Sequence, residues 1–372
     1  MKANTRMRYA LPLACVLFAS VCGLSPAIAT QREAGQTDQI GTPATINSRI
    51  GSALFLAVTR AGTRLVAVGE RGFILLSDDA GRTWRQARSV PVSVTLTNVR
   101  FVSAELGWAV GHAGVVLNSR DGGESWVRQL DGAQAAQRVL QDAQAGVAQA
   151  DAAAGRLLRD AERLVADGPD KPLLGLHFID ERRGWVVGAY GLALATDDGG
   201  QSWHSIMRRF ENPAGKHLYD IREGEGGLVI AGEQGVLLRS GNGGDSFAAV
   251  ATPYAGTYFG TVSAAGRMLA YGLRGNVYRR VEGAADWQKL DPGLPVTVTA
   301  GIELADHSIA LADQAGRVLR SSDGGMRFTA VPASGSRSIT GLAQAGDGAL
   351  ILSGMGGMTR IEPDAIAMET KR

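Results

Sequence analysis

Two short signatures recur along this 372-residue chain and constrain its fold more than any other feature. The first is typified by AVGERG and occurs seven times. The third residue of this six-residue signature is Gly in six units and Asp in one: Gly69, Gly111, Gly188, Gly232, Gly272, Asp313 and Gly354. Their spacings are 42, 77, 44, 40, 41 and 41 residues, so a single interval exceeds the common period. A period of this length indicates a chain built from repeated structural units.

The second signature follows the first in five of the units and has the pattern S-x-D-x-G-x-[TS]-[WF]. It is clearest in SRDGGESW at 119–126. The Asp or Asn at the third position can accept N–H bonds within its own turn, the fifth-position Gly tolerates positive φ, and the aromatic residue can pack between sheets. We therefore predict a structural, non-catalytic role for the third-position residues, which are Asp79, Asp121, Asp198, Asn242 and Asp323.

Each unit reads as four short strands separated by turns, which predicts an all-β fold. Seven such units favour a seven-bladed β-propeller of four-stranded antiparallel blades, because a closed ring protects the edges of its sheets. A linear solenoid is the alternative. The seventh unit lacks the aromatic turn, so we expect a strand from 44–50 to complete the last blade and close the ring.

The long interval contains a segment rich in Ala, Gln, Asp and Arg, which predicts an α-helical insertion at 131–170 between blades two and three. A helical hairpin that turns between Gly146 and Gly155 would return the chain to the ring. Two interpretations stay open for this insertion: a decoration packed on its own propeller, or an arm that docks a partner.

The first 29 residues have the charged, apolar and small-residue order of a secretory signal peptide, ending in Ala27-Ile28-Ala29. We expect cleavage there, then a linker at 30–43, the propeller at 44–362 and a C-terminal tail at 363–372. Both cysteines lie in the leader, which suits an oxidising compartment. Without the leader the charge is 35 basic minus 36 acidic residues, which argues against nucleic-acid binding.

The sequence offers no HExxH, GxSxG or phosphate-loop motif, and its five histidines show no metal-ligand spacing. We predict no cofactor and no metal, and each histidine is expected on the surface or satisfied in the core. Sialidases also carry such box turns, and they resemble one another in an Arg-Ile-Pro segment before the first box. This chain has no Arg-Ile-Pro segment before its first box. A secreted glycan-active enzyme or lectin is kept as the alternative to a protein without catalysis.

The stretches GWAVGHAGVVLNSRDGGESW (107–126) and GWVVGAYGLALATDDGGQSW (184–203) resemble the photosystem II stability and assembly factor family of Asp-box propellers. The resemblance implies a non-catalytic assembly or accessory factor that binds a subunit of a membrane protein complex. It allows a photosynthetic context or a bacterial one beside transporters of the resistance-nodulation-division type. It also implies an exported protein, peripheral at the membrane, in the periplasm or a compartment like the thylakoid lumen.

We expect the partner to bind the face that carries the turns between second and third strands, together with the blade-to-blade connections. Mixed charge and aromatic residues there suit a protein surface. The residues proposed for binding are expected at equivalent positions of these turns and are Arg71, His112, Tyr190, Glu233, Gln234 and Arg274. Lys216, His217, Tyr254 and Tyr258 lie in the adjacent connections.

Overall fold

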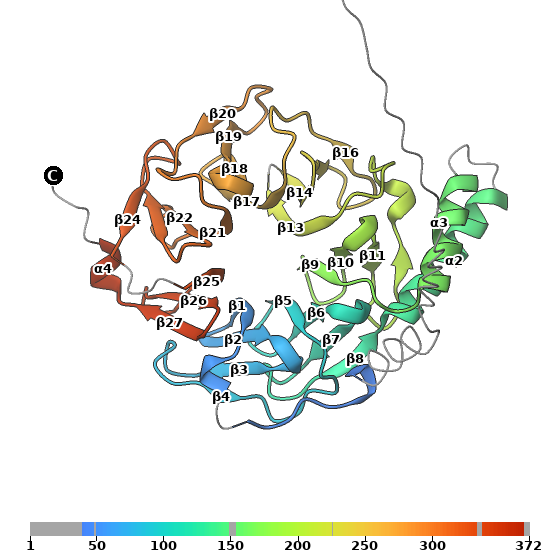
Figure 1. Cartoon of the computed structure of the whole chain (residues 1–372), viewed down its shortest axis with the longest axis horizontal. Helices are drawn as coiled ribbons and strands as arrows, with labels where there is room; N and C mark the ends of the chain where they lie inside the picture. The colour runs from blue at the N-terminus through green and yellow to red at the C-terminus, as the bar shows by residue number, and fades with distance from the viewer. Residues whose placement is uncertain (1–38, 48–49, 149–153, 225, 333–336, 368–372) are drawn as a thin grey trace, which may run out of the picture.

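Seven antiparallel sheets follow one another around a ring in the computed structural model (Figure 1), which confirms the predicted propeller. The structure describes residues 39–47, 50–148, 154–224, 226–332 and 337–367. The predicted signal peptide lies outside these residues, so its cleavage stays a prediction. In the described part of the chain, no helix has the length and apolar character needed to cross a membrane.

Blades one to three run from the innermost to the outermost strand in chain order. Blade one contains β1 (Phe55–Ala61), β2 (Arg64–Gly69), β3 (Ile74–Ser77) and β4 (Arg85–Gln86). Blade two contains β5 (Leu96–Phe101), β6 (Gly107–Gly111), β7 (Val116–Ser119) and β8 (Val127–Leu130). Blade three contains β9 (Leu173–Phe178), β10 (Gly184–Gly188), β11 (Ala193–Thr196) and β12 (His204–Ser205).

The remaining blades repeat this order. Blade four contains β13 (Leu218–Gly224), β14 (Gly227–Gly232), β15 (Leu237–Ser240) and β16 (Ala248–Ala249). Blade five contains β17 (Tyr258–Ala264), β18 (Arg267–Gly272), β19 (Val277–Val281) and β20 (Gln288–Leu290). Blade six contains β21 (Val298–Glu303), β22 (Ile309–Asp313), β23 (Val318–Ser321) and β24 (Thr329–Val331). Blade seven contains β25 (Ile339–Gln344), β26 (Leu350–Gly354) and β27 (Gly357–Ile361), followed by the short helix α4 (Pro363–Ala367).

The glycine that ends the second strand is required by a close backbone approach. A Cβ atom added to Gly69 would lie 2.1 Å from the carbonyl oxygen of Leu54, and one added to Gly272 would lie 2.0 Å from that of Thr257. The innermost strand opposite carries a β-bulge at the same place, for example between Phe55 and Ala57. The recurring signature therefore encodes the fit between the first two strands of a blade.

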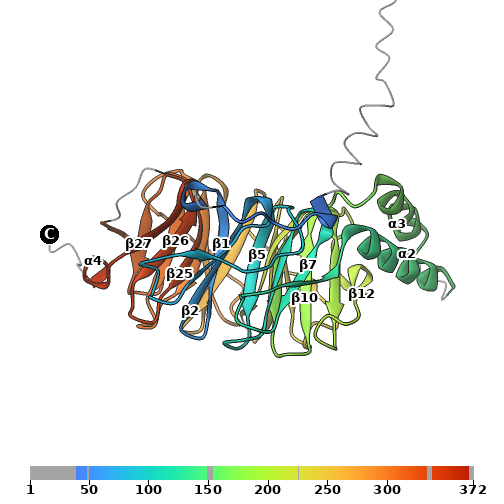
Figure 2. The same ribbon diagram turned by 90° about the horizontal axis from the view of Figure 1, so that it is seen from below.

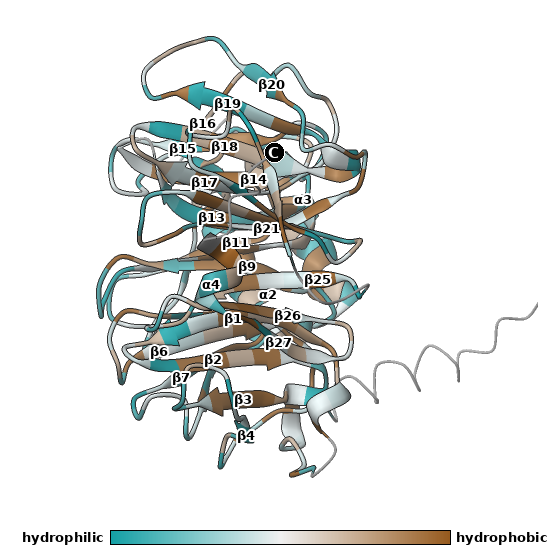
Figure 3. Cartoon of the chain, turned by 90° about the vertical axis from the view of Figure 1, so that its left-hand side faces the viewer, coloured by the Kyte–Doolittle hydropathy of each residue, from teal (hydrophilic) through white to brown (hydrophobic). Residues whose placement is uncertain are grey.

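The core of the protein lies between neighbouring blades. Leu65 and Ala67 of β2 pack with Ile351 of blade seven, and Trp108 of blade two stacks on Phe178 of blade three with ring centroids 3.6 Å apart. Hydrophobic residues accordingly colour strands such as β2, β3, β26 and β27 in Figure 3. Four tryptophans are at most 4% exposed, as packing between sheets requires, namely Trp108, Trp126, Trp185 and Trp203, whereas Trp84 and Trp287 are half-buried.

The expected closing strand at 44–50 was wrong for the residues that the structure describes. Residues 42–47 form no strand, and blade seven has three strands among the described residues. The segment binds the outer edge of blade one instead: Ala44 N donates to Val90 O at 3.0 Å and Gln86 Nε2 donates to Thr45 O at 2.8 Å. The 3₁₀ turn η1 (Ile50–Ser52) then lies against the start of β27, where Gly357 faces Gly51.

Ring closure instead uses the contact that joins other blades. Thr97 of β5 donates its hydroxyl to Leu173 O of blade three at 2.6 Å, and Thr299 of β21 donates to Ile339 O of blade seven at 2.7 Å. Thr340 of β25 makes the equivalent bond to Phe55 O of blade one at 2.6 Å. The innermost strands of blades seven and one are therefore joined directly.

The predicted helical insertion is confirmed between blades two and three as α2 (Gly132–Ala148) and α3 (Ala154–Asp167). The predicted turn falls partly on residues 149–153, outside the described residues. The helices lie outside the ring, beside blades two and three (Figures 1 and 2). Val139 and Ala143 of α2 and Ala161 of α3 join the same apolar cluster as Leu192 of blade three. The insertion is thus packed on its own propeller.

Candidate functional site

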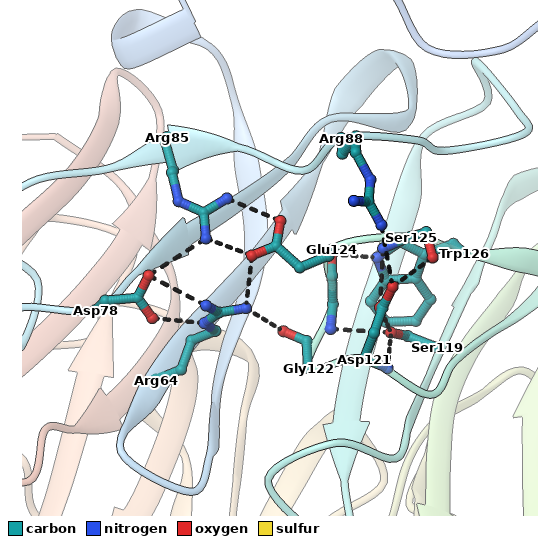
Figure 4. Close-up of polar contacts among 11 residues, drawn as sticks. Arg64, Asp78, Arg85, Arg88, Ser119, Asp121, Gly122, Glu124, Ser125 and Trp126 are labelled. Carbon is teal, nitrogen blue, oxygen red and sulfur yellow. Dashed lines mark hydrogen bonds and ion pairs between the residues drawn. The ribbon is translucent and has the colours of Figure 1, made fainter.

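The box turns use their acidic side chains in local hydrogen bonds (Figure 4). Asp121 Oδ1 accepts from the Ser125 backbone N–H at 2.9 Å and from the Ser119 hydroxyl at 2.9 Å, while Oδ2 accepts from the Ser125 hydroxyl at 2.5 Å. The Ser119 hydroxyl oxygen accepts in turn from Gly123 N at 2.9 Å. Asp79, Asp198, Asn242 and Asp323 accept the corresponding backbone bond.

These bonds favour the charged carboxylate. Hydrogen bonds from the Thr83 hydroxyl and backbone lower the pKa of Asp79 to about 2. At the fifth position, Gly81 and Gly123 have φ of 85° and 89°, as the pattern predicted. The acidic groups of the boxes are committed to their own turns, which agrees with a structural role.

Ion pairs also tie the boxes of adjacent blades together. Arg64 of β2 contacts Asp78 at 2.6 Å and Glu124 of blade two at 3.0 Å, and Arg85 pairs with the same two carboxylates (Figure 4). The guanidinium groups of Arg85 and Arg64 lower the pKa of Glu124, chiefly through the hydrogen bond from Arg85. This face of the ring is thus cross-linked between blades one and two.

The opposite face carries the six turn residues predicted to bind a partner. Arg71, Tyr190, Gln234 and Arg274 share a left-handed backbone, with φ between 53° and 57°. His112 and Glu233 each precede that position by one residue, since Ala113 and Gln234 hold the left-handed geometry in their blades. The six are therefore only partly equivalent, in contrast to the sequence prediction.

The turns containing these residues are the 3₁₀ segments of several blades. They are η2 (Glu70–Gly72), η3 (His112–Gly114), η4 (Ala189–Gly191) and η6 (Leu273–Gly275), while Glu233 and Gln234 are the two residues that follow β14. Arg71, His112 and Arg274 belong to blades one, two and five. His112 N donates to Thr95 O at 2.8 Å and Arg274 N to Thr297 Oγ1 at 3.4 Å. Burial lowers the pKa of His112.

Contacts do bring Tyr190 and Glu233 together, through His217. The Tyr190 backbone N–H donates to His217 Nδ1 at 2.7 Å, and the two rings meet edge to face with centroids 4.8 Å apart. His217 N donates to Glu233 Oε1 at 2.8 Å. Lys216 Nζ donates to Gln234 O at 3.4 Å. Blades three and four thus share one polar cluster at this face.

The insertion extends this cluster. Lys171, which follows α3, lies over the Tyr190 ring with Nζ 5.2 Å from the ring centroid. Its ammonium also pairs with Asp167 at 3.3 Å and with Asp170. Tyr190 remains 59% exposed, so its ring is held by neighbours yet open to solvent. An ordered, exposed aromatic ring is typical of a protein-binding surface.

Tyr190 lies at a groove between the insertion and blade three, with a volume of about 350 Å³. Apolar residues from both sides line it, including Leu157, Leu164, Leu192, Met207 and Phe210. Two polar contacts span the groove. Arg156 of α3 donates to Pro213 O at 2.7 Å, and Arg208 of η5 (Met207–Arg209) lies 3.9 Å from Asp142 of α2. We call these residues and Tyr190 the insertion groove.

Sequence reasoning missed most of the insertion groove. Tyr190 was predicted, but Met207 and Phe210 lie in an irregular connection, and Arg156 carries no distinguishing pattern. Tyr258, expected at the surface, is fully buried at 0% exposure, whereas Tyr254 is partly buried beside it. The residues Arg100, Asp220 and Arg222, which line the central channel, were also missed.

His177 also differs from expectation, because its buried Nε2 atom has no hydrogen-bond partner among the described residues. Burial, together with Arg100 and Arg222, lowers its pKa to about 4. Within the described ranges, no three His, Cys, Asp or Glu side chains gather to hold a metal ion.

The fold and the box turns together define the class: a seven-bladed Asp-box propeller with a helical insertion beside blade three. Residues 164–291 match the model of the family described as photosynthesis system II assembly factor YCF48. The resemblance to the photosystem II assembly factor-like propellers is thereby confirmed. No curated protein matches the chain.

Solved structures show the same ring. "YCF48 bound to D1 peptide" matches with a TM-score of 0.62 and 16% identity, over 86% of this chain and 95% of that one. YCF48 from Cyanidioschyzon merolae matches with a TM-score of 0.62 and 16% identity, over 84% and 97%. A streptogramin B lyase matches with a TM-score of 0.63 and 12% identity, over 86% and 96%. At these identities the likeness concerns the fold alone.

Proposed function

We propose that this protein is an exported, non-catalytic assembly or accessory factor that binds a segment of a membrane protein. The family match and the name of the peptide-bound YCF48 structure support a protein partner. The signal-peptide pattern of the first 29 residues supports export. A photosynthetic context and a transporter context both remain compatible with the proposal.

The observation that carries the proposal is the insertion groove. It combines an apolar lining with the exposed ring of Tyr190 and with an edge of paired charges, in which Lys171 pairs with Asp167 and Arg208 lies near Asp142. Such a surface suits an apolar segment of a protein, because an exposed aromatic anchor beside an apolar groove contributes strongly to recognition. The committed box carboxylates argue against the alternative, a glycan-active enzyme.

Photo-crosslinking in cells tests the proposal. A photoreactive residue at position 190 is compared with one at position 71, because both sites share the left-handed turn but only Tyr190 lines the groove. We expect an adduct with an integral membrane protein at 190 and none at 71. Equal labelling at both positions, or labelling of glycans, would contradict the proposed site.

Export has its own test. Cell fractionation should find the protein outside the cytoplasm, and the mature N-terminus should be Thr30. A chain that retains Met1 would contradict export by cleavage, independently of the crosslinking result.

A further inference from the structure

The innermost strands enclose a central channel that contains two arginines. Its cavity has a volume of about 180 Å³, and its polar lining includes Arg100 of β5, Asp220 and Arg222 of β13, and Tyr271 of β18. Arg100 and Arg222 are both half-buried, and the Arg222 side chain is 26% exposed, so the channel limits their access to water without removing it, which favours partners for their charges. Their pairing therefore indicates what the channel can bind.

Arg222 is partly neutralised. Its Nη1 donates to Gly301 O at 2.9 Å, and its Nε lies 2.6 Å from Asp220 Oδ2 in an ion pair that lacks hydrogen-bond alignment. Asp220 is only 5% exposed, so this carboxylate is committed to the channel. The Nη2 group of Arg222 forms no hydrogen bond to a described residue, and the side chain is 26% exposed, so this group stays available.

Arg100 has no direct hydrogen-bond or ion-pair partner within the described part of the chain, although the charge of Asp220 acts on it from a distance. Its guanidinium forms no hydrogen bond or ion pair with any described residue, in contrast to Arg64 and Arg360 at the rim. Burial, and then the charge of Arg222, lower the pKa of Arg100 to about 10, while the carboxylate of Asp220 acts in the opposite direction. With Asp220 balancing one arginine and His177 neutral, the cluster keeps one unbalanced positive charge.

We infer that the central channel binds a small, singly charged oxyanion, a carboxylate of the size of acetate, between Arg100 and the available Nη2 of Arg222. A carboxylate matches the planar fork of a guanidinium and balances the remaining charge. The cavity far exceeds the roughly 30 Å³ that one water molecule occupies, so an anion of four heavy atoms fits.

A second cavity gives the anion a path from solvent. It has a volume of about 420 Å³, shares Arg100 with the channel cavity, and is also lined by Arg60, Glu303 and His307, with Glu303 Oε1 2.9 Å from His307 Nδ1. His307 is 80% exposed at its side chain, so this cavity opens at the ring surface. Arg100 thus lies where the mouth meets the channel.

Thermal unfolding in sodium acetate and in sodium chloride of equal ionic strength tests the inference. Acetate should raise the melting temperature of the wild-type protein by about 2 °C or more over chloride, since a ligand that binds only the folded state stabilises it. Arg100→Met should lose this difference. Arg71→Met, which removes the same charge from an exposed turn on the opposite face, should keep it.

In chloride, Arg100→Met should melt at or above the wild-type temperature, because it removes an unpaired charge that repels Arg222. An acetate effect of equal size in wild type and Arg100→Met would overturn the inference, as would no acetate effect in wild type. If Arg100→Met does not fold, calorimetric titration of wild type and Arg100→Lys with acetate decides. Saturable one-to-one binding weakened at least about tenfold by the lysine supports the site, and unchanged or absent binding overturns it.

Discussion

Asp197 and Asp198 are adjacent in the box turn of blade three, yet they have different surroundings. Asp198 accepts the Ser202 backbone N–H at 2.8 Å and two hydroxyl groups, whereas the Asp197 side chain is exposed. The carboxylate at the third position of the box thus accepts a backbone N–H inside the turn, in the place of a backbone carbonyl. This role could be predicted from the sequence, because all of its bonds form within eight residues.

The two aspartates form a matched pair for mutation. Asp198→Ala should lower the free energy of unfolding by about 0.5 to 2 kcal/mol, as loss of a local cap does. Asp197→Ala should stay within about 0.5 kcal/mol of wild type. Denaturant unfolding measures both, and equal effects would contradict the structural role of the third position.

Acid should weaken the boxes. The pKa of Asp79 is about 2 in the folded protein, below the value of about 3.9 expected when unfolded. Its contribution is therefore complete above about pH 4 and is lost as the pH falls toward 2. Asp79→Asn removes this titration and resembles Asn242, which donates from Nδ2 to the Ser246 hydroxyl at 2.9 Å. Melting temperatures between pH 4 and 2 should fall less steeply in Asp79→Asn, and parallel curves would refute this cause.

At the scale of elements, the insertion is both part of the propeller core and one wall of the groove. Val139 of α2 is 6% exposed and joins the apolar cluster of blades two and three, while Val147 of the same helix is 44% exposed. The alanine-rich composition predicted the helices. It could not predict their packing, because the side chains that receive them come from the distant residues Leu192 and Met207.

Val139→Asn and Val147→Asn test this packing. The first should destabilise the protein by about 2 to 4 kcal/mol, through lost burial and an amide without a partner, and the second by no more than about 0.5 kcal/mol. Equal, small effects would show that the insertion stands free of the ring.

For the whole molecule, the periodic signatures predicted the seven blades because each blade is specified by its own turns and close backbone contacts. How the ring closes depends on the two ends meeting in space, and there the expected strand at 44–50 was wrong. Thr340 supplies the junction instead, repeating the bond made by Thr97 and Thr299. Arg100 and Arg222 likewise line the same channel only because the ring places blades two and four around it. No local sequence pattern could therefore predict that the two arginines share one cavity.

The central claim is that the insertion groove receives a segment of the partner. Hydrogen–deuterium exchange of the protein, alone and in complex with the membrane protein captured by crosslinking, tests it most directly. We expect slower exchange in α3 and in residues 207–215, with little change in the box turns of the opposite face. Protection confined to the box turns, or to the turns around Arg71 and Arg274, would contradict it.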